Sequence, residues 1–160
     1  MVVIITGVAG AGKTTVGALL ARELGWQFHD GDALHPAANI EKMRRGEPLD
    51  DADRAPWLAA VRAVIENAVA RGDNVIVACS ALKASYRAAL RVGLDVVFVY
   101  LKIDPALAKE RLARRAGHFM NPILMQSQFD ALEEPATALE VDASAPAAEI
   151  IKTIRARLRI

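Results

Sequence analysis

The chain has 160 residues, 53% of them hydrophobic, and its 20 basic and 19 acidic residues leave a formal net charge of +1. This length and apolar content predict a single globular domain over residues 1–160 with a well-filled core, and they exclude a disordered chain. The balanced charge gives no reason to expect a surface for nucleic acid or membrane, and no apolar run reaches the ~18 residues that a membrane span needs.

Short apolar, β-branched runs alternate with helical patterns along the chain, which predicts an α/β fold with a parallel sheet flanked by helices. The expected strands are Val2–Thr6, Trp26–His29, Val75–Cys79, Val96–Lys102 and Ala138–Asp142. The expected helices are Lys13–Leu24, Pro36–Arg45, Arg54–Arg71, Lys83–Arg91, Pro105–Arg115, Pro122–Leu132 and Ala145–Arg159. Asp104 and Asn121 are the expected N-caps of two helices that begin with proline.

A phosphate-binding motif stands between the first strand and the first helix. The eight residues from Gly7 to Thr14, GVAGAGKT, fit the pattern G-x-x-x-x-G-K-[ST]. In this pattern backbone N–H groups converge on a phosphate, the lysine supplies a charge for the β- and γ-phosphates, and the threonine hydroxyl can ligate Mg²⁺. The motif predicts a nucleoside triphosphate site, whose expected loop residues are Gly7, Ala9, Gly10, Ala11, Gly12, Lys13, Thr14 and Thr15.

Phosphate-loop enzymes usually have an aspartate at the end of an apolar strand that helps to hold Mg²⁺, but the best such strand in this chain has none. Val75–Cys79 is followed by SALK, without a carboxylate. Asp30 and Asp32 follow the second strand instead, at the end where ligands gather in parallel sheets. One of these carboxylates can face Mg²⁺ or its waters and the other a substrate hydroxyl. The alternative is a solvated Asp-Gly turn, which is common in isolation.

The cysteine content bears on the compartment. Cys79 is the single cysteine of the chain, which excludes an internal disulfide and makes a reducing cytoplasm the expected location. Because the phosphate loop begins at Gly7, we also expect no signal peptide. The apolar run around Cys79 predicts a buried strand residue rather than a nucleophile.

The segment DDADRAPWL begins with three acids, Asp50, Asp51 and Asp53, which are typical of a helix N-terminus stabilised by the helix dipole. Arg54 follows them. Its planar guanidinium suits a carboxylate or a phosphate, but the pattern alone leaves its contact with a substrate undecided. Trp57 is expected in the core.

Arg111, Arg114 and Arg115 are spaced so that they share one face of a helix. Such a face is usually only solvated. In a kinase, however, a mobile segment that carries arginines can close over ATP and stabilise phosphoryl charge. We therefore expect a lid at about residues 111–126, in which Arg111 binds the nucleotide and Arg115 is catalytic.

Four stretches carry a resemblance to a known family: GVAGAGKTT, FHDGDALHPAANIEKMRRGEPLDDADRAPWL, ACSALKASYRAALR and RAGHFMNPILMQSQFDALEEP. Together they reach over most of the chain between residues 4 and 135, and the later stretches are more specific than the phosphate loop alone. On these residues the chain resembles the small gluconate kinases of the shikimate-kinase-like phosphate-loop group.

The resemblance implies a P-loop kinase fold, with a five-stranded parallel sheet and a mobile lid, and Mg²⁺- and ATP-dependent phosphorylation of D-gluconate to 6-phospho-D-gluconate. The catalytic residues that it implies are Lys13, Asp32 and Arg115. The implied metal-binding residues are Thr14 and Asp30. The implied gluconate-binding residues are Asp32, His35, Arg54, Lys83 and His118. Family members are often dimers, so a homodimer stays open beside a monomer.

The chain departs from the family pattern at a few positions. Ala9, Ala11 and Thr14 stand where the family loop commonly has serine, and Ala52 interrupts a run of acids. Backbone N–H groups do most of the phosphate binding and threonine keeps a hydroxyl, so we expect little loss. Two alternatives stay open: a related kinase that acts on shikimate, another small hydroxy acid or a nucleotide, and an ATP-binding protein without catalysis.

Overall fold

The structure is a computed structural model, and its described residues are 1–114 and 122–160. In this part of the chain five strands form one sheet in the order β2-β3-β1-β4-β5, and every neighbouring pair is parallel. The strands are β1 (Val2–Thr6), β2 (Gln27–Asp30), β3 (Val75–Ala78), β4 (Val96–Lys102) and β5 (Leu139–Asp142). The predicted five-stranded parallel sheet is confirmed.

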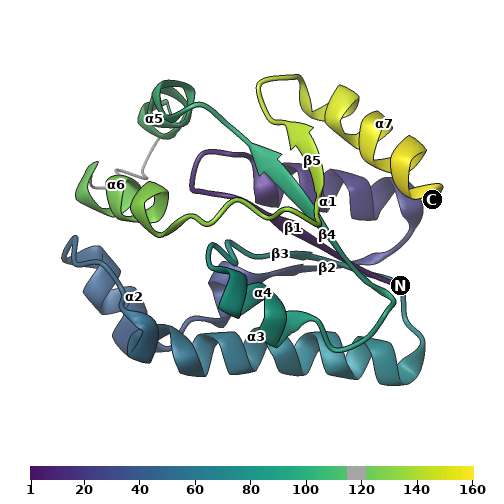
Figure 1. Cartoon of the computed structure of the whole chain (residues 1–160), viewed down its shortest axis with the longest axis horizontal. Coiled ribbons are helices and arrows are strands. Elements are labelled where there is room, and N and C mark those ends of the chain that lie inside the picture. The colour runs from purple at the N-terminus through teal and green to yellow at the C-terminus, as the bar shows by residue number, and fades with distance from the viewer. Residues whose placement is uncertain (115–121) are drawn as a thin grey trace.

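Helices cover both faces of this sheet. They are α1 (Lys13–Leu24), α2 (Ala37–Arg44), α3 (Asp51–Arg71), α4 (Ala84–Leu90), α5 (Pro105–Ala113), α6 (Pro122–Ala131) and α7 (Ala147–Leu158), and a short 3₁₀ turn, η1 (Gly31–Leu34), follows β2. Figure 1 shows α3 and α4 on one side of the sheet and α1 with α7 on the other. No helix among the described residues is long and apolar enough to cross a membrane.

The alternation of side chains along each strand divides the core in two. On β1, Val3 and Ile5 pack with α1 and α7, whereas Val2 and Ile4 pack with α3 and α4. Successive side chains of a strand point to opposite faces of a sheet, so a strand buried on both faces is apolar throughout. This is why β1 is a continuous apolar run.

The helix that leads to Arg54 begins earlier than predicted. It was expected to begin at Arg54, but α3 begins at Asp51, because Asp50 and Asp53 form a capping box: each side chain accepts a hydrogen bond from the other's backbone N–H, at 2.8 and 2.9 Å. Arg54 therefore lies within the first turn of α3. The expectation that these acids stabilise a helix N-terminus is confirmed for Asp50 and Asp53.

Gly31 lets the turn after β2 pack closely against the end of β3. A Cβ atom on Gly31 would lie 2.6 Å from the carbonyl oxygen of Ala78, and the Gly31 carbonyl accepts a hydrogen bond of 2.8 Å from the buried Trp57 indole. Only a residue without a side chain fits there. The close contact fixes where Asp30 and Asp32 leave the sheet.

We expect Gly31→Ala to destabilise the protein by about 1–3 kcal/mol, because the new methyl group meets backbone atoms that cannot move away. Urea denaturation measures the change in the free energy of unfolding. Gly93→Ala is the matched control, since a Cβ atom there meets nothing within 4 Å. Equal stability of the two variants would contradict the prediction.

Candidate functional site

The loop after β1 has the backbone that its glycines predict. Gly10 and Gly12 have φ values of 84° and 91°, a region that residues with a side chain rarely adopt. Gly12 is the N-cap of α1, so the positive end of the helix dipole points into the loop. Lys13 lies over the loop, with its Nζ atom 3.0 Å from the carbonyl oxygen of Val8. The loop thus brings its N–H groups, one cation and the helix N-terminus together.

Thr14 and Asp30 meet at the same edge of the sheet. The Thr14 hydroxyl donates a hydrogen bond of 3.2 Å to Oδ2 of Asp30, and Oδ1 of Asp30 accepts one of 3.0 Å from the backbone N–H of Asp32. A hydroxyl beside a carboxylate is a pair of hard oxygen donors, and Mg²⁺ in kinases is commonly held by one or two such groups together with phosphates of the substrate. The pair fits a magnesium site.

Cys79 lies below this edge, directly after β3, and is fully buried. Burial raises the pKa of its thiol to about 12, and the charges that act on the thiol include those of Lys13, Asp30 and Asp32. Cys79 is therefore a protonated core residue, as predicted. The hydrogen bond from Thr14 places Asp30 beside the phosphate loop, as predicted from the strand ends.

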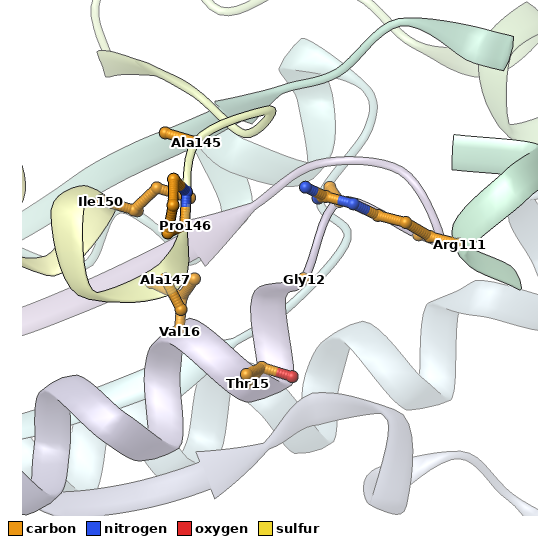
Figure 2. A pocket seen from close by; sticks show the side chains of 10 residues that line it. Gly12, Thr15, Val16, Arg111, Ala145, Pro146, Ala147 and Ile150 are labelled. Atoms are coloured by element: carbon orange, nitrogen blue, oxygen red, sulfur yellow. The ribbon is translucent and has the colours of Figure 1, made fainter. Parts of the chain in front are cut away.

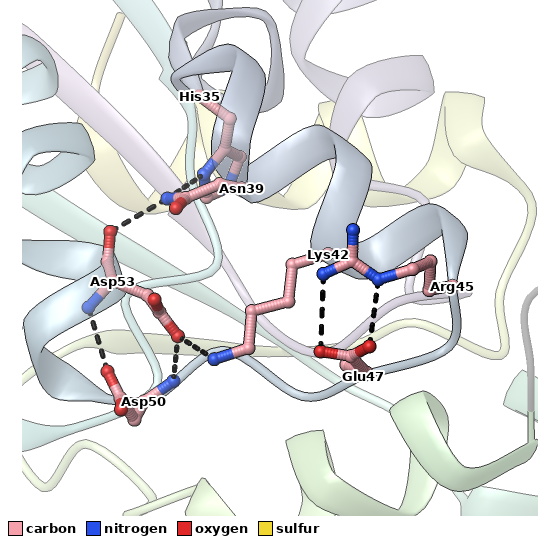
Figure 3. A network of polar contacts seen from close by, with 7 residues as sticks. All are labelled: His35, Asn39, Lys42, Arg45, Glu47, Asp50 and Asp53. Atoms are coloured by element: carbon pink, nitrogen blue, oxygen red, sulfur yellow. Dashed lines mark hydrogen bonds and ion pairs between the residues drawn. The ribbon is translucent and has the colours of Figure 1, made fainter.

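His35 is held in one orientation. Its ring stacks on Trp57, with centroids 4.7 Å apart and an interplanar angle of 6°. The Asn39 amide nitrogen donates to the Asp53 carbonyl oxygen at 2.7 Å and lies 3.3 Å from Nδ1 of His35 (Figure 3). Because the carbonyl fixes the amide nitrogen as a donor, Nδ1 accepts and the neutral ring carries its proton on Nε2.

A network of charges fixes the turn between α2 and α3. Lys42 forms an ion pair of 2.5 Å with Asp53, and Arg45 pairs with Glu47 at 2.8 Å (Figure 3). The hydrogen bond from Lys42 lowers the pKa of Asp53, and the backbone N–H of Asp50 adds to this effect. Asp53 therefore stays ionised at neutral pH. Its ion pair with Lys42 connects α2 to the N-terminus of α3, next to Arg54.

The predicted substrate residues Arg54 and Lys83 lie in one polar cluster. Arg54 is half-buried, and its Nη1 atom lies 3.3 Å from the hydroxyl of Tyr86. Lys83 forms an ion pair with Asp51. The charges of Asp32 and Arg54 both act on the pKa of His35. Sequence reasoning singled out neither Tyr86 nor the role of Asp51.

A cavity of about 300 Å³ adjoins the phosphate loop on the side of α7. It lies between Gly12 and Thr15 on one side and the segment Ala145–Ala147 on the other, and the side chain of Arg111 reaches toward the loop from α5 (Figure 2). Arg111, predicted to bind the nucleotide, thus borders a space next to the phosphate loop. Sequence reasoning missed Ala145–Ala147, because small residues before a helix carry no recognisable pattern.

An unexpected contact joins α6 to the phosphate loop. The side-chain oxygen of Gln128 accepts a hydrogen bond of 2.7 Å from the backbone N–H of Ala9. Ala9 is one of the loop residues predicted to bind phosphate. In this structure its N–H is therefore bonded within the protein.

The remaining predicted residues are not described. Arg115 and His118 lie outside the described residues, as does the central part of the expected lid at residues 111–126. On either side of this gap, α5 ends at Ala113 and α6 begins at Pro122.

A phosphate loop that opens a parallel sheet of this strand order, with an acid at the end of β2, defines a P-loop kinase. A family model described as the AAA domain matches residues 2–139. A gluconokinase from Gluconobacter oxydans (strain 621H) is 50% identical over 133 residues, which cover 82% of this chain and 75% of that protein. The chain belongs to the gluconokinase family, as its resemblance implied.

Solved structures agree with this assignment. A gluconokinase from Sinorhizobium meliloti 1021 is 43% identical and superposes with a TM-score of 0.85. The superposition covers 98% of this chain and 91% of that one. An unliganded sugar kinase from Janibacter sp. HTCC2649 is 39% identical, with a TM-score of 0.91 over 99% of this chain and 94% of that one.

The surroundings of His35 make stability depend on pH. Burial lowers the pKa of the ring from its usual 6.5, against the opposite effect of Asp32, and the charge of Arg54 lowers it further. The unfolded chain therefore binds a proton more readily than the folded one. The stabilisation is complete above the unfolded pKa and is lost as the pH falls below it toward the folded pKa.

We expect the melting temperature to fall between about pH 7 and about pH 5, a window above the titration of most carboxylates. His35→Phe keeps a ring on Trp57 but cannot take up a proton, so its melting temperature should change less over this window. Thermal denaturation at several pH values measures both curves. Parallel curves for the two proteins would show that His35 is not the group responsible.

Gln128→Ala should tighten nucleotide binding, because it removes the side chain that bonds to the Ala9 N–H. One neutral hydrogen bond contributes about 0.5–1.5 kcal/mol, so we expect the Kd for ADP to fall by about 2- to 10-fold. Titration with a fluorescent ADP analogue measures it. Gln126→Ala is the control on the same helix, since Gln126 bonds to Asp130 instead. A higher Kd for Gln128→Ala would contradict the prediction and mean that the glutamine binds the nucleotide.

Proposed function

We propose that the protein transfers the γ-phosphoryl group of ATP to the C6 hydroxyl of D-gluconate, which yields ADP and 6-phospho-D-gluconate. One observation carries the proposal. The phosphate loop contacts Asp30 at one edge of the sheet, and the half-buried Arg54 lies on the neighbouring α3. The first suits a triphosphate with its metal, and the second suits the carboxylate of a sugar acid. The names of relatives up to 50% identical support the same substrate.

In this proposal the phosphate loop binds the phosphates of ATP. Lys13 and the backbone N–H groups bind the β- and γ-phosphates, and Thr14 with Asp30 would hold Mg²⁺, which when bound neutralises charge on the phosphate oxygens. The cavity beside Gly12 and Arg111 is the place where the nucleoside would lie. Arg115 is the arginine that we propose to stabilise the transferred phosphoryl group.

The acceptor side falls to Asp32 and Arg54. Asp32 is exposed at the first turn of η1, and its backbone N–H is held by Asp30. Its carboxylate can accept the proton of the attacking hydroxyl. Arg54 would bind the carboxylate at the far end of the substrate, with His35, Lys83 and His118 as further proposed contacts. Catalysis is then mainly positioning and charge stabilisation.

The same proposal covers the setting of the enzyme. A closing lid at about residues 111–126, a single domain over residues 1–160 and a cytoplasmic location are parts of it. A buried free thiol at Cys79 is compatible with a reducing compartment. A homodimer and a monomer are both compatible with the site, because each residue assigned to it comes from one chain.

The test is ADP release by the purified protein with Mg²⁺ and ATP. We expect turnover with D-gluconate and much less with D-glucose, which lacks the carboxylate, and with shikimate. Chelation of the metal should abolish turnover. Equal turnover with D-glucose would overturn the role given to Arg54, and ATP binding without turnover on any sugar acid would indicate a non-catalytic protein.

Asp32→Asn sharpens this test, because it keeps the shape of the side chain but makes a poor proton acceptor. A positioned general base contributes about 10²- to 10⁴-fold, so kcat should fall by about 10²-fold or more, with little change in the Kd for ATP. A kcat near that of the wild type would assign Asp32 a structural role only.

A further inference from the structure

A cluster of four side chains joins the N-termini of α3 and α4 beside the proposed acceptor site. Asp51 and Arg54 come from the first turn of α3, and Lys83 and Tyr86 come from the N-cap and first turn of α4. Tyr86 lies between the others and is only 7% exposed. Tyr86 belongs to α4 and contacts Asp51 and Arg54 of α3, so it links Arg54 to the second helix.

The hydroxyl of Tyr86 has a fixed direction. It donates a short hydrogen bond to Oδ1 of Asp51, since an ionised carboxylate can only accept. Its lone pairs are then left for Nη1 of Arg54, which lies 3.3 Å away and can only donate. One hydroxyl thus links the carboxylate of Asp51 to the guanidinium of Arg54.

The two cations of the cluster have different partners. Nζ of Lys83 lies 2.7 and 2.9 Å from the two carboxylate oxygens of Asp51, so its charge is balanced. This ion pair raises the pKa of Lys83 and, with the hydrogen bond from Tyr86, lowers the pKa of Asp51. Arg54, in contrast, bonds to the neutral hydroxyl of Tyr86, and no carboxylate of the described residues forms an ion pair with it.

The ring of Tyr86 also attracts both cations. The Arg54 guanidinium carbon lies 5.9 Å from the ring centroid, and Nζ of Lys83 lies 5.7 Å from it. These distances are within the range of cation–π attraction. The ring therefore helps to hold the side chain of Arg54 without neutralising its charge.

We propose that Tyr86 is a positioning residue for sugar-acid specificity: its hydroxyl, oriented by Asp51, holds Arg54 in place for the substrate carboxylate, while Lys83 serves as the counter-ion of Asp51. The inference rests on the proposed function. Holding a long arginine side chain in its binding geometry reduces the entropy lost when the substrate binds. Tyr86 acts through Arg54 and touches neither the phosphates nor the reacting hydroxyl.

Tyr86→Phe tests this by removing one oxygen atom and keeping the ring. We expect the KM for D-gluconate to rise by about 3- to 10-fold, with kcat and the KM for ATP within about twofold of the wild type. The preference for D-gluconate over D-glucose should fall by a similar factor. Tyr100→Phe is the matched control, because Tyr100 is a buried tyrosine on β4 whose hydroxyl lies 3.5 Å from Glu134, and its kinetics should be unchanged.

A double mutant separates positioning from a general packing role. Arg54→Ala should raise the KM for D-gluconate more than Tyr86→Phe does, and adding Tyr86→Phe to Arg54→Ala should change it no further. Additive effects would show that Tyr86 acts independently of Arg54 and would overturn the proposal. So would an unchanged KM in Tyr86→Phe while the wild type phosphorylates D-gluconate. A wild type without gluconate turnover would instead overturn the proposed function.

Folding is checked by circular dichroism and melting temperature. If Tyr86→Phe does not fold, Asp51→Ala replaces it, because it removes the oxygen that accepts the hydrogen bond of the Tyr86 hydroxyl and leaves Tyr86 and Arg54 unchanged. The same selective rise in the KM for D-gluconate supports the proposal. An unchanged KM in Asp51→Ala overturns it.

Discussion

The parallel pairing of β1, β3 and β2 is the constraint on which the site depends. The pairing delivers the ends of these strands to one edge of the sheet, so Thr14 and Asp30 meet although 16 residues separate them in the chain. The close contact of Gly31 with Ala78 then limits where the turn after β2 can go. Without this edge the phosphate loop would lack a carboxylate partner.

The end of β3 contributes backbone instead of an acid. The Ser80 carbonyl oxygen accepts hydrogen bonds from the Gly7 backbone and the Thr6 hydroxyl, so it supports the start of the phosphate loop. Ala81 follows with a φ of 38°, which a residue with a side chain rarely adopts. The buried Arg87 donates to the carbonyl oxygens of Ala81 and Leu82 at 2.9 and 2.8 Å and holds this conformation in place. The carboxylate beside Thr14 comes instead from Asp30 on the neighbouring strand.

The three acids at the N-terminus of α3 make different contacts. Asp50 and Asp53 accept hydrogen bonds from backbone N–H groups, and Asp53 also binds Lys42, so both have partners within the fold. Asp51 points to α4 instead, where it receives Lys83 and Tyr86. Three acids that look equivalent in sequence therefore have different partners in the folded protein.

The sequence by itself determined the elements and the nucleotide site, because both rest on local patterns. Short continuous apolar runs predicted the strands, and the glycine spacing with Lys13 and Thr14 predicted the phosphate loop. The predicted start of α3 at Arg54 is wrong by three residues, because the capping box of Asp50 and Asp53 places Asp51 at the first position of this helix.

Only the tertiary structure decided which side chains meet across the site. Gln128 reaches Ala9 across 119 residues, and Tyr86 reaches Arg54 across 32. The cavity next to Gly12 is also lined by Ala145, Pro146 and Ala147, which form no recognisable sequence pattern. No spacing rule links such positions, because their distance is set by how helices pack on the sheet and not by the period of a helix or strand.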